Sequence, residues 1–206
     1  MKRVIARLLA GTLLAVLIVV AAVWLGLRAS LPELDGEAVV EGIDAEVTIE
    51  RDADGIPVIT ASSRADLAFA TGYAHGQDRF FQMDLIRRQA AGELSELVGA
   101  AAIEVDKRFR FHRFRARAEA VYAAASDNEK ALMDAYAAGV NAGLESLGAR
   151  PFEYFVLGAR PEPWQVTDSL LAVYNMYTQL NDMRATKEVR RGLAHRVLPA
   201  DVYAWL

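Results

Sequence analysis

The sequence predicts a mostly helical α+β chain in which one short β-hairpin precedes a series of amphipathic helices. Residues 46–60 alternate like two strands around a turn, capping sequences open long apolar stripes, and an uncharged run precedes both. The 206 residues suffice for one domain with a hydrophobic core, or for part of a larger one. We expect a membrane or signal segment at 1–28, a linker at 29–44 and a folded region at 45–206.

The first element is the apolar run at residues 8–27, which contains no charged side chain. A helix of about twenty residues spans roughly 30 Å, the thickness of the hydrocarbon core of a bilayer. Basic residues precede the run, so the positive-inside rule leaves the N-terminus in the cytoplasm and everything after Arg28 across the membrane. The run is long for a signal peptide and a poor cleavage site follows it, which favours an uncleaved anchor over a cleaved signal. Either alternative places the remaining chain in the periplasm or outside the cell.

A linker and a hairpin follow the apolar run. Proline and glycine interrupt any periodicity in residues 29–44, and acidic residues keep this segment in water. Residues 47–51 alternate as in a strand, and the turn sequence of residues 52–55 ends in a glycine. Pro57 cannot donate to a ladder, so it belongs at a strand start or at an edge.

Helical periodicity continues to the end of the chain. The first of these helices begins at a capping box, Ser63 to Asp66, and runs to about Ala91. Gly72 and Gly76 inside it cost about 1 kcal/mol each relative to alanine, which indicates close contact with another backbone or a break near residue 76. The pattern predicts further helical segments at residues 111–125, from the capping box Ser126–Glu129 to Gly148, from a Thr167 cap to Leu180, and from about Thr186.

Composition excludes several classes of chemistry. The sequence has no cysteine, which removes disulfides, thiolate nucleophiles and cysteine-based metal sites. Its formal net charge of −4 gives no global basic field for nucleic acid. The basic and aromatic run at residues 107–117 is interpreted as a helix whose Phe111 and Phe114 face the core. We therefore expect no nucleic-acid partner.

The residues alone predict no catalytic group in this chain. Phosphate loops and nucleophile elbows are absent from the sequence. The polar residues Asp78, Arg79 and Asp84 within an apolar helix are expected to tie that helix to neighbouring backbone rather than to catalyse. We expect packing or hydrogen-bonding roles for the three histidines, which lack metal-binding spacing: His75, His112 and His195.

An ordered set of motifs resembles one family. The motifs are Arg51-Asp, Gly55-Ile-Pro, Gly72-Tyr-Ala-His, Gln77-Asp-Arg and Gln82-Met, followed by Tyr136-Ala-Ala-Gly-Val-Asn141 and Arg160-Pro-Glu-Pro-Trp164. This order is similar to the α-chain of penicillin acylases and acyl-homoserine-lactone acylases, which are N-terminal nucleophile hydrolases. The chain departs from the family at Asp54, where an aromatic residue is usual, and at Val58, where histidine is usual. These departures concern the subfamily rather than membership.

The resemblance implies a four-layer αββα sandwich that an α-chain and a β-chain build jointly, and the hydrolysis of linear amide bonds. The family's catalytic serine is the first residue of the β-chain, so we expect this chain to be truncated before its β-chain partner and inactive alone. Implied substrates are β-lactams with acyl side chains, N-acyl-homoserine lactones or related acyl amines, in antibiotic metabolism or quorum quenching. The alternative is a non-catalytic membrane-anchored scaffold or binding protein, or a gene fragment that keeps the α-chain fold.

The resemblance also implies site residues near the end of the chain. Glu188 matches the one α-chain carboxylate that binds a structural calcium ion, whose other ligands come from the β-chain. Thr178 and Asp182 match the acyl-pocket positions of the family. A charge at Asp182 suits an apolar pocket poorly. Either the register slips by a residue or two and places Leu180 there, or the enzyme prefers something other than a simple apolar acyl group.

Overall fold

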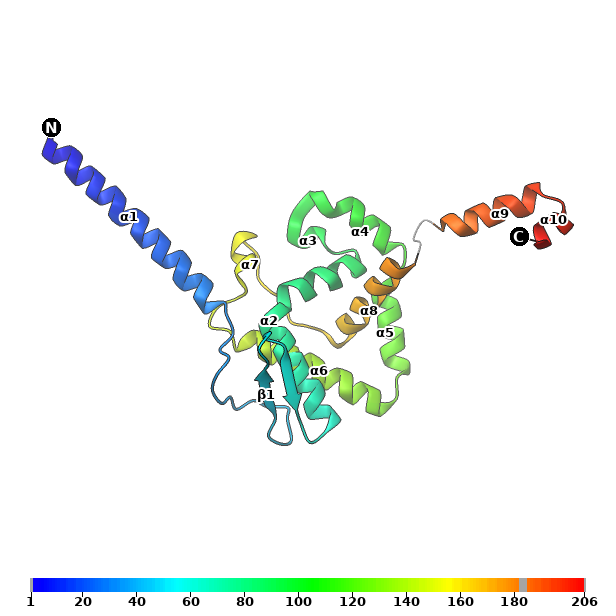
Figure 1. The fold of residues 1–206 in the computed structure, drawn as a ribbon, viewed down its shortest axis with the longest axis horizontal. Coiled ribbons are helices and arrows are strands. Elements are labelled where there is room, and N and C mark those ends of the chain that lie inside the picture. Colours follow the sequence, from blue (N-terminus) through cyan, green and yellow to red (C-terminus); the bar gives the residue numbers. More distant parts are fainter. Residues whose placement is uncertain (1, 182–184, 206) are drawn as a thin grey trace.

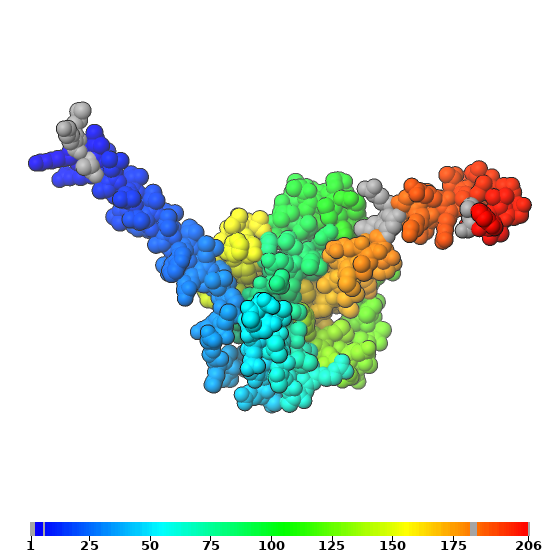
Figure 2. Space-filling view, viewed as in Figure 1, coloured from blue at the N-terminus to red at the C-terminus, as the bar shows by residue number. Residues whose placement is uncertain are grey.

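The computed structural model describes residues 2–181 and 185–205 and confirms a mostly helical chain with one hairpin (Figure 1). In chain order the elements are α1 Lys2–Ala29, β1 Thr48–Arg51, β2 Pro57–Thr60, α2 Arg64–Ala91, α3 Ser95–Val98, η1 Gly99–Ala102, α4 Ile103–Arg110, α5 Phe114–Ala124, α6 Asp127–Glu145, α7 Phe152–Val156, α8 Val166–Leu180, α9 Thr186–Val197 and α10 Ala200–Trp205. Helices α2 to α8 form a central body. Helix α1 projects from one side of that body, and α9 with α10 projects from the other (Figures 1 and 2).

The hairpin has the expected position and turn chemistry. Strands β1 and β2 pair antiparallel, with Arg51 opposite Pro57 at the turn end, so the proline stands at the start of its strand. In the turn, Asp52 Oδ1 accepts hydrogen bonds from the backbone N–H groups of Asp54 at 3.0 Å and Ile56 at 2.8 Å. An ion pair of 2.9 Å between Arg51 and Asp78 then fastens the hairpin to α2.

Helix α2 begins at the predicted Ser63 cap, but the Asp66 carboxylate bonds to the Ser63 hydroxyl and not to the Ser63 backbone N–H as a full capping box would. Ser63 Oγ accepts a hydrogen bond from the Asp66 N–H at 3.0 Å. The buried Asp66 carboxylate also accepts from the Asp44 N–H at 2.8 Å, so the cap holds the preceding linker as well. At the other end Gly92 has a φ of 73°, which is the left-handed conformation that glycine adopts without strain.

The two glycines inside α2 mark its contact with α6. A Cβ atom on Gly72 would lie 2.2 Å from the Tyr136 carbonyl oxygen, and one on Gly76 equally close to that of Val140. Across the contact, a Cβ on Gly139 would lie 1.9 Å from the Phe69 carbonyl oxygen. Close backbone contact, the first of the two expected explanations, is therefore confirmed. The helix also bends, but at Arg79, where φ is −141° and ψ is 21°, rather than at residue 76.

Two predicted helix starts are wrong, and each for a local reason. The segment 111–125 is helical only from Phe114, because α4 ends at Arg110 and Arg113 adopts a left-handed φ of 52° between the two helices. Phe111 is therefore 85% exposed instead of facing the core. Helix α8 begins one residue before Thr167, because Gln165 forms its capping box by donating its backbone N–H to Asp168 Oδ2 at 2.8 Å.

Two hydrophobic clusters fill the body. The first joins α2, α3, α6, α7 and the connector before α8, through Phe80, Leu97, Ala137, Val140, Tyr154 and Trp164. The second joins α2, α4, α5 and α8, through Ala90, Phe109, Phe114, Ala118 and Leu171. Helix α2 contributes to both clusters and is the central element of the fold.

A buried polar network connects the two clusters. Asp84 is fully buried and accepts from the Nε atoms of Arg87 at 2.7 Å and Arg88 at 2.9 Å, and from the Tyr154 hydroxyl at 2.7 Å. Burial, followed by the hydrogen bond to Asp84, raises the pKa of the Tyr154 hydroxyl far above its usual value, so it remains a donor. Arg87 also donates to Asp168 Oδ2 at 2.5 Å. Asp84 thus has the structural role that the sequence predicts.

The glycine contact gives a direct test of the α2–α6 interface. Gly139→Ala should lower the free energy of unfolding by about 1–3 kcal/mol, because the added methyl group meets a backbone carbonyl that cannot move aside. Gly192→Ala is the matched control, since no atom lies within 4 Å of its Cβ position on the exposed helix α9. Urea denaturation in detergent, followed by circular dichroism, gives both values. Equal midpoints for the two variants would contradict the close contact.

The buried network gives a second test. Asp168→Ala should cost about 3–5 kcal/mol of unfolding free energy, because the Arg87 guanidinium stays buried after losing one carboxylate partner. Glu104→Ala removes the carboxylate of an exposed ion pair with Lys107 and should leave the stability unchanged. The same denaturation assay compares them. An equal decrease in the free energy of unfolding for both variants would show that burial does not make the network's ion pairs more important for stability than an exposed pair.

Candidate functional site

Helix α8 carries Thr178, the first of the predicted site residues. Its side chain is 5% exposed, and its hydroxyl donates to the Asn175 carbonyl oxygen at 2.7 Å, so both the methyl and the polar atom are used inside the chain. The opposite face of α8 is exposed and apolar. That face consists of Val173, Met176, Tyr177 and Leu180, which are 53%, 54%, 59% and 77% exposed.

The other two predicted site residues lie beyond this helix. Asp182 falls outside the described residues. Glu188 is an exposed side chain in the first turn of α9, where its charge complements the helix dipole. Among residues 2–181 and 185–205 no three carboxylate or histidine side chains gather as a metal site. One exposed carboxylate such as Glu188 cannot by itself satisfy a calcium ion, which takes about six to eight oxygens.

The three histidines have packing and hydrogen-bonding roles, as expected. His75 Nδ1 lies 2.9 Å from the Tyr136 hydroxyl, across the α2–α6 contact. His112 stacks on Phe114 with ring centroids 4.9 Å apart, and His195 meets the Tyr203 ring edge-on at 4.8 Å. None of these contacts pairs an imidazole with a nucleophilic side chain.

Cations of the basic run at residues 107–117 serve the fold in the same way. Arg115 forms an ion pair with Glu93, and Arg110 Nε donates to the Gly92 carbonyl oxygen at 2.7 Å at the end of α2. Phe109 and Phe114 are buried in the second hydrophobic cluster. Arg110 and Arg115 of this run therefore make polar contacts within the fold, and two of its phenylalanine rings are buried. Phe111 is exposed to solvent.

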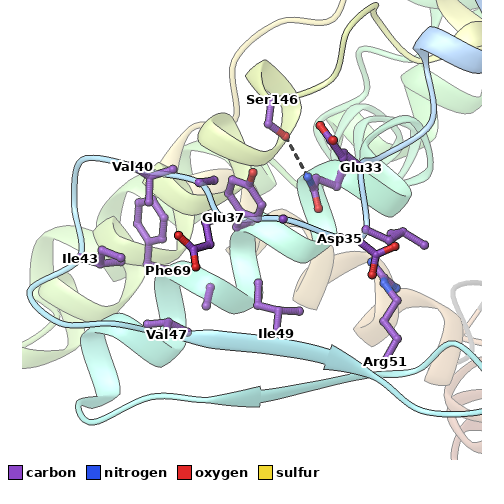
Figure 3. Close-up of a pocket in the computed structure, with 16 residues that line it drawn as sticks. Glu33, Asp35, Glu37, Val40, Ile43, Val47, Ile49, Arg51, Phe69 and Ser146 are labelled. Atoms are coloured by element: carbon purple, nitrogen blue, oxygen red, sulfur yellow. Dashed lines mark hydrogen bonds between the residues drawn. The ribbon is translucent and has the colours of Figure 1, made fainter.

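A cavity of about 380 Å³ lies between the linker, the hairpin and α2 (Figure 3). Its apolar wall combines Val47 and Ile49 of the hairpin side with Phe69 of α2, and linker residues 33–43 pass over it. The linker contributes the carboxylates of Glu33, Asp35 and Glu37. The volume is within the range of small-molecule sites.

The side chains around this cavity are suited to binding rather than to catalysis. Ser146 contributes a hydroxyl group at one end of the cavity, but its Oγ donates to the Gly143 carbonyl oxygen at 2.8 Å and accepts from Gln77 Nε2 at 3.0 Å (Figure 3). No imidazole or carboxylate hydrogen-bonds to this hydroxyl in the described part of the chain, so no base activates it.

The contacts that hold α2 against α8 and the connector before it were not predicted from the sequence. Arg87 pairs with Asp168 of α8 and also donates to the carbonyl oxygens of Glu162 and Pro163 at 2.9 Å. Arg88 pairs with Glu96 of α3 and with Glu162 of the connector before α8. The adjacent arginines Arg87 and Arg88 inside an apolar helix are the sequence feature that could have indicated a buried ion network. Three acceptors of Arg87 lie 75, 76 and 81 positions away in the sequence, at separations that no local pattern reveals.

Helix α1 has the length and composition to cross a membrane. The stretch Arg3–Ala29 has a mean hydropathy of 2.7 in its most apolar window, and none of that window is buried against the body. A signal sequence near an N-terminus has the same properties, so both alternatives of the sequence analysis stay open.

Known proteins resemble this chain in sequence. A penicillin acylase 2 proenzyme from Pseudomonas sp. strain SE83 is 43% identical over 144 residues, which is 70% of this chain and 19% of that protein. The acyl-homoserine lactone acylase QuiP of Pseudomonas aeruginosa is 35% identical over 180 residues, or 86% of this chain and 21% of that protein. The chain thus spans about a fifth of the length of these relatives.

A solved structure resembles it in fold. The thermostable penicillin G acylase from Alcaligenes faecalis matches with a TM-score of 0.62 and 28% identity, over 77% of this chain and 87% of the matched chain. The model of the penicillin amidase family matches residues 46–206, which include the hairpin and all helices of the body. The chain therefore belongs to the penicillin amidase family.

Proposed function

We propose that this chain is the α-chain portion of an acylase that hydrolyses linear amide bonds, together with a β-chain from the same precursor. One observation carries the proposal. The chain matches 87% of one chain of a solved penicillin G acylase, but only 19% of a penicillin acylase proenzyme. This difference is what a precursor that is cut into a short and a long chain produces.

The chemistry of the described residues supports a missing catalytic partner. Amide hydrolysis needs a nucleophile, a base within hydrogen-bond reach and donors for the oxyanion. The Ser146 hydroxyl and the three histidines make other contacts, and the buried carboxylates of Asp84 and Asp168 are paired with arginine. We therefore assign the nucleophilic serine to the β-chain and a structural and substrate-binding role to this chain.

The exposed face of α8 is the part of this chain that suits an acyl group. The proposed substrates are β-lactams with acyl side chains, N-acyl-homoserine lactones or related acyl amines, which share an amide-linked acyl group. Leu180 is 77% exposed at the end of α8, whereas Thr178 is 5% exposed. This contrast supports the slipped register, in which Leu180 contacts the acyl group and Thr178 lies behind it.

Calcium and the membrane complete the proposal. Glu188 would give one carboxylate to a structural calcium ion, and the β-chain would give the remaining oxygens. Its exposed position on α9 leaves the carboxylate accessible to a second chain. Helix α1 would hold the acylase in the cytoplasmic membrane with its body in the periplasm or outside, unless a signal peptidase removes it.

Activity assays test the catalytic part of the proposal. The purified 206-residue chain should match buffer alone with phenylacetyl and long-chain acyl amides, because it lacks a nucleophile. The precursor made with the downstream coding sequence should hydrolyse at least one of them, and its variant without the first β-chain serine should not. Turnover by the isolated chain that survives repurification would overturn the mechanism. An inactive but correctly cut precursor would favour the scaffold alternative.

Maturation assays test the calcium assignment. In the precursor, Glu188→Ala should reduce the fraction that is cut and folded, because the ion's binding energy is part of the folding energy. After calcium is removed, added calcium should restore maturation of the wild-type precursor at lower concentrations than it does for the variant. Lys187→Ala changes the neighbouring exposed position and should behave as wild type. Equal maturation and equal calcium dependence in all three proteins would make Glu188 an ordinary surface residue.

A further inference from the structure

We propose that an exposed apolar surface around α7 contacts the lipid bilayer beside α1. The body would then bind the membrane at a second place, in addition to its attachment through α1. This α7 surface consists of Phe152, Phe155, Val156 and Leu157, which are 47%, 49%, 80% and 38% exposed. The inference rests on the proposal that α1 spans the membrane, and it adds a second contact that fixes the orientation of the body.

Helix α7 is firmly attached to the body from its inner side. Tyr154 is fully buried, and its hydroxyl donates to Asp84 at 2.7 Å in the polar network. Its ring meets the Phe81 ring edge-on, with centroids 5.3 Å apart. One side chain thus anchors the short helix, while the α7 surface points away from the core. A rigid attachment of this kind is what a docking surface needs.

The end of α1 is fixed to the residues directly before α7. The Ala149 N–H donates to the Ala29 carbonyl oxygen at 2.8 Å, and Ser30 Oγ donates to the Arg150 carbonyl oxygen at 3.0 Å. Ser30 and Phe152 also line one small cavity between the two segments. Figure 1 shows α7 beside the carboxyl end of α1. The body is therefore docked on the helix end rather than tethered by a free linker.

Chain lengths place α7 at the depth of the lipid headgroups. The uncharged run at residues 8–27 fills the hydrocarbon core of roughly 30 Å, so Ala29 lies in the headgroup region, which is about 5–8 Å deep on each side. Phe152 follows Ala149 by three residues, and three residues span at most about 11 Å. Phe152 therefore lies within about 11 Å of the residue that pairs with Ala29, which is close enough for contact with the headgroup region.

The side chains at this junction suit a membrane interface. Trp24 and Arg28 stand on the last turns of α1, with the guanidinium 5.8 Å from the ring centroid. The Arg150 guanidinium lies 4.3 Å from the Phe155 ring centroid, so a second cation covers an aromatic ring of the α7 surface. Aromatic rings and cations with apolar stems concentrate where lipid tails meet headgroups. The α7 surface thus matches lipid in composition as well as in position.

Fluorescence quenching by lipids tests this contact. Because the sequence has no cysteine, Val156→Cys gives the full 206-residue chain one attachment point for an environment-sensitive nitrobenzoxadiazole dye. In phosphatidylcholine vesicles the dye at position 156 should emit at shorter wavelength and lose intensity when lipids with quenching nitroxides are included. Phe152→Cys should behave in the same way. Val121→Cys is the matched control, since Val121 is 46% exposed on α5 and should give neither effect.

A carbonate wash of the same vesicles separates the two proposals. Retention of the chain with no quenching at positions 152 and 156 would leave the α1 anchor intact and overturn the α7 contact. Release of the chain would show that α1 does not anchor it, which removes the premise. Measurements on the precursor distinguish the rival occupant: a dye at 156 that is shielded from aqueous iodide, yet not quenched by lipid, would show that the β-chain covers the α7 surface.

Discussion

The backbone contact between α2 and α6 is the constraint on which the remaining structure depends. Two glycines on each helix bring the backbones so close that a Cβ at Gly76 or Gly143 would lie 2.2 or 2.1 Å from a carbonyl oxygen. At this separation the first hydrophobic cluster can close around Val140, and His75 can reach the Tyr136 hydroxyl. The kink of α2 at Arg79 then directs its second half toward α4, α5 and α8.

The buried ion network carries this arrangement from the core to the exposed face of α8. Burying charges is costly, and the cost is offset only when partners satisfy them fully. Arg87 is satisfied by Asp84, Asp168 and the carbonyl oxygens of the connector before α8, so these segments are held in one geometry. The network thus contributes specificity, because it fixes which side of α8 is buried and which side remains exposed.

Local patterns predicted the elements whose causes are local. The alternation of residues 47–51, the Ser63 and Ser126 caps and the glycines of α2 all have the expected structure. The predictions for Thr167 and Phe111 were wrong because a nearby residue has the predicted role instead. Gln165 caps α8 in place of Thr167, and Phe109 is buried in place of Phe111. In the candidate site, the burial of Thr178 follows from packing of α8 on distant helices, so sequence spacing alone could not show it.

Exposed apolar side chains lie on two separate parts of this chain, which supports the two neighbours proposed above. A soluble monomer rarely exposes large contiguous apolar patches. Figure 1 places α8 and α9 on the side of the body away from α1 and α7 beside the end of α1, and each of these helices carries exposed apolar side chains. A single partner that covered α8 and α9 would have to extend across the body to reach α7 as well. In the arrangement proposed above, a β-chain covers the α8 and α9 side and completes the acyl site there, while the bilayer covers the α7 surface.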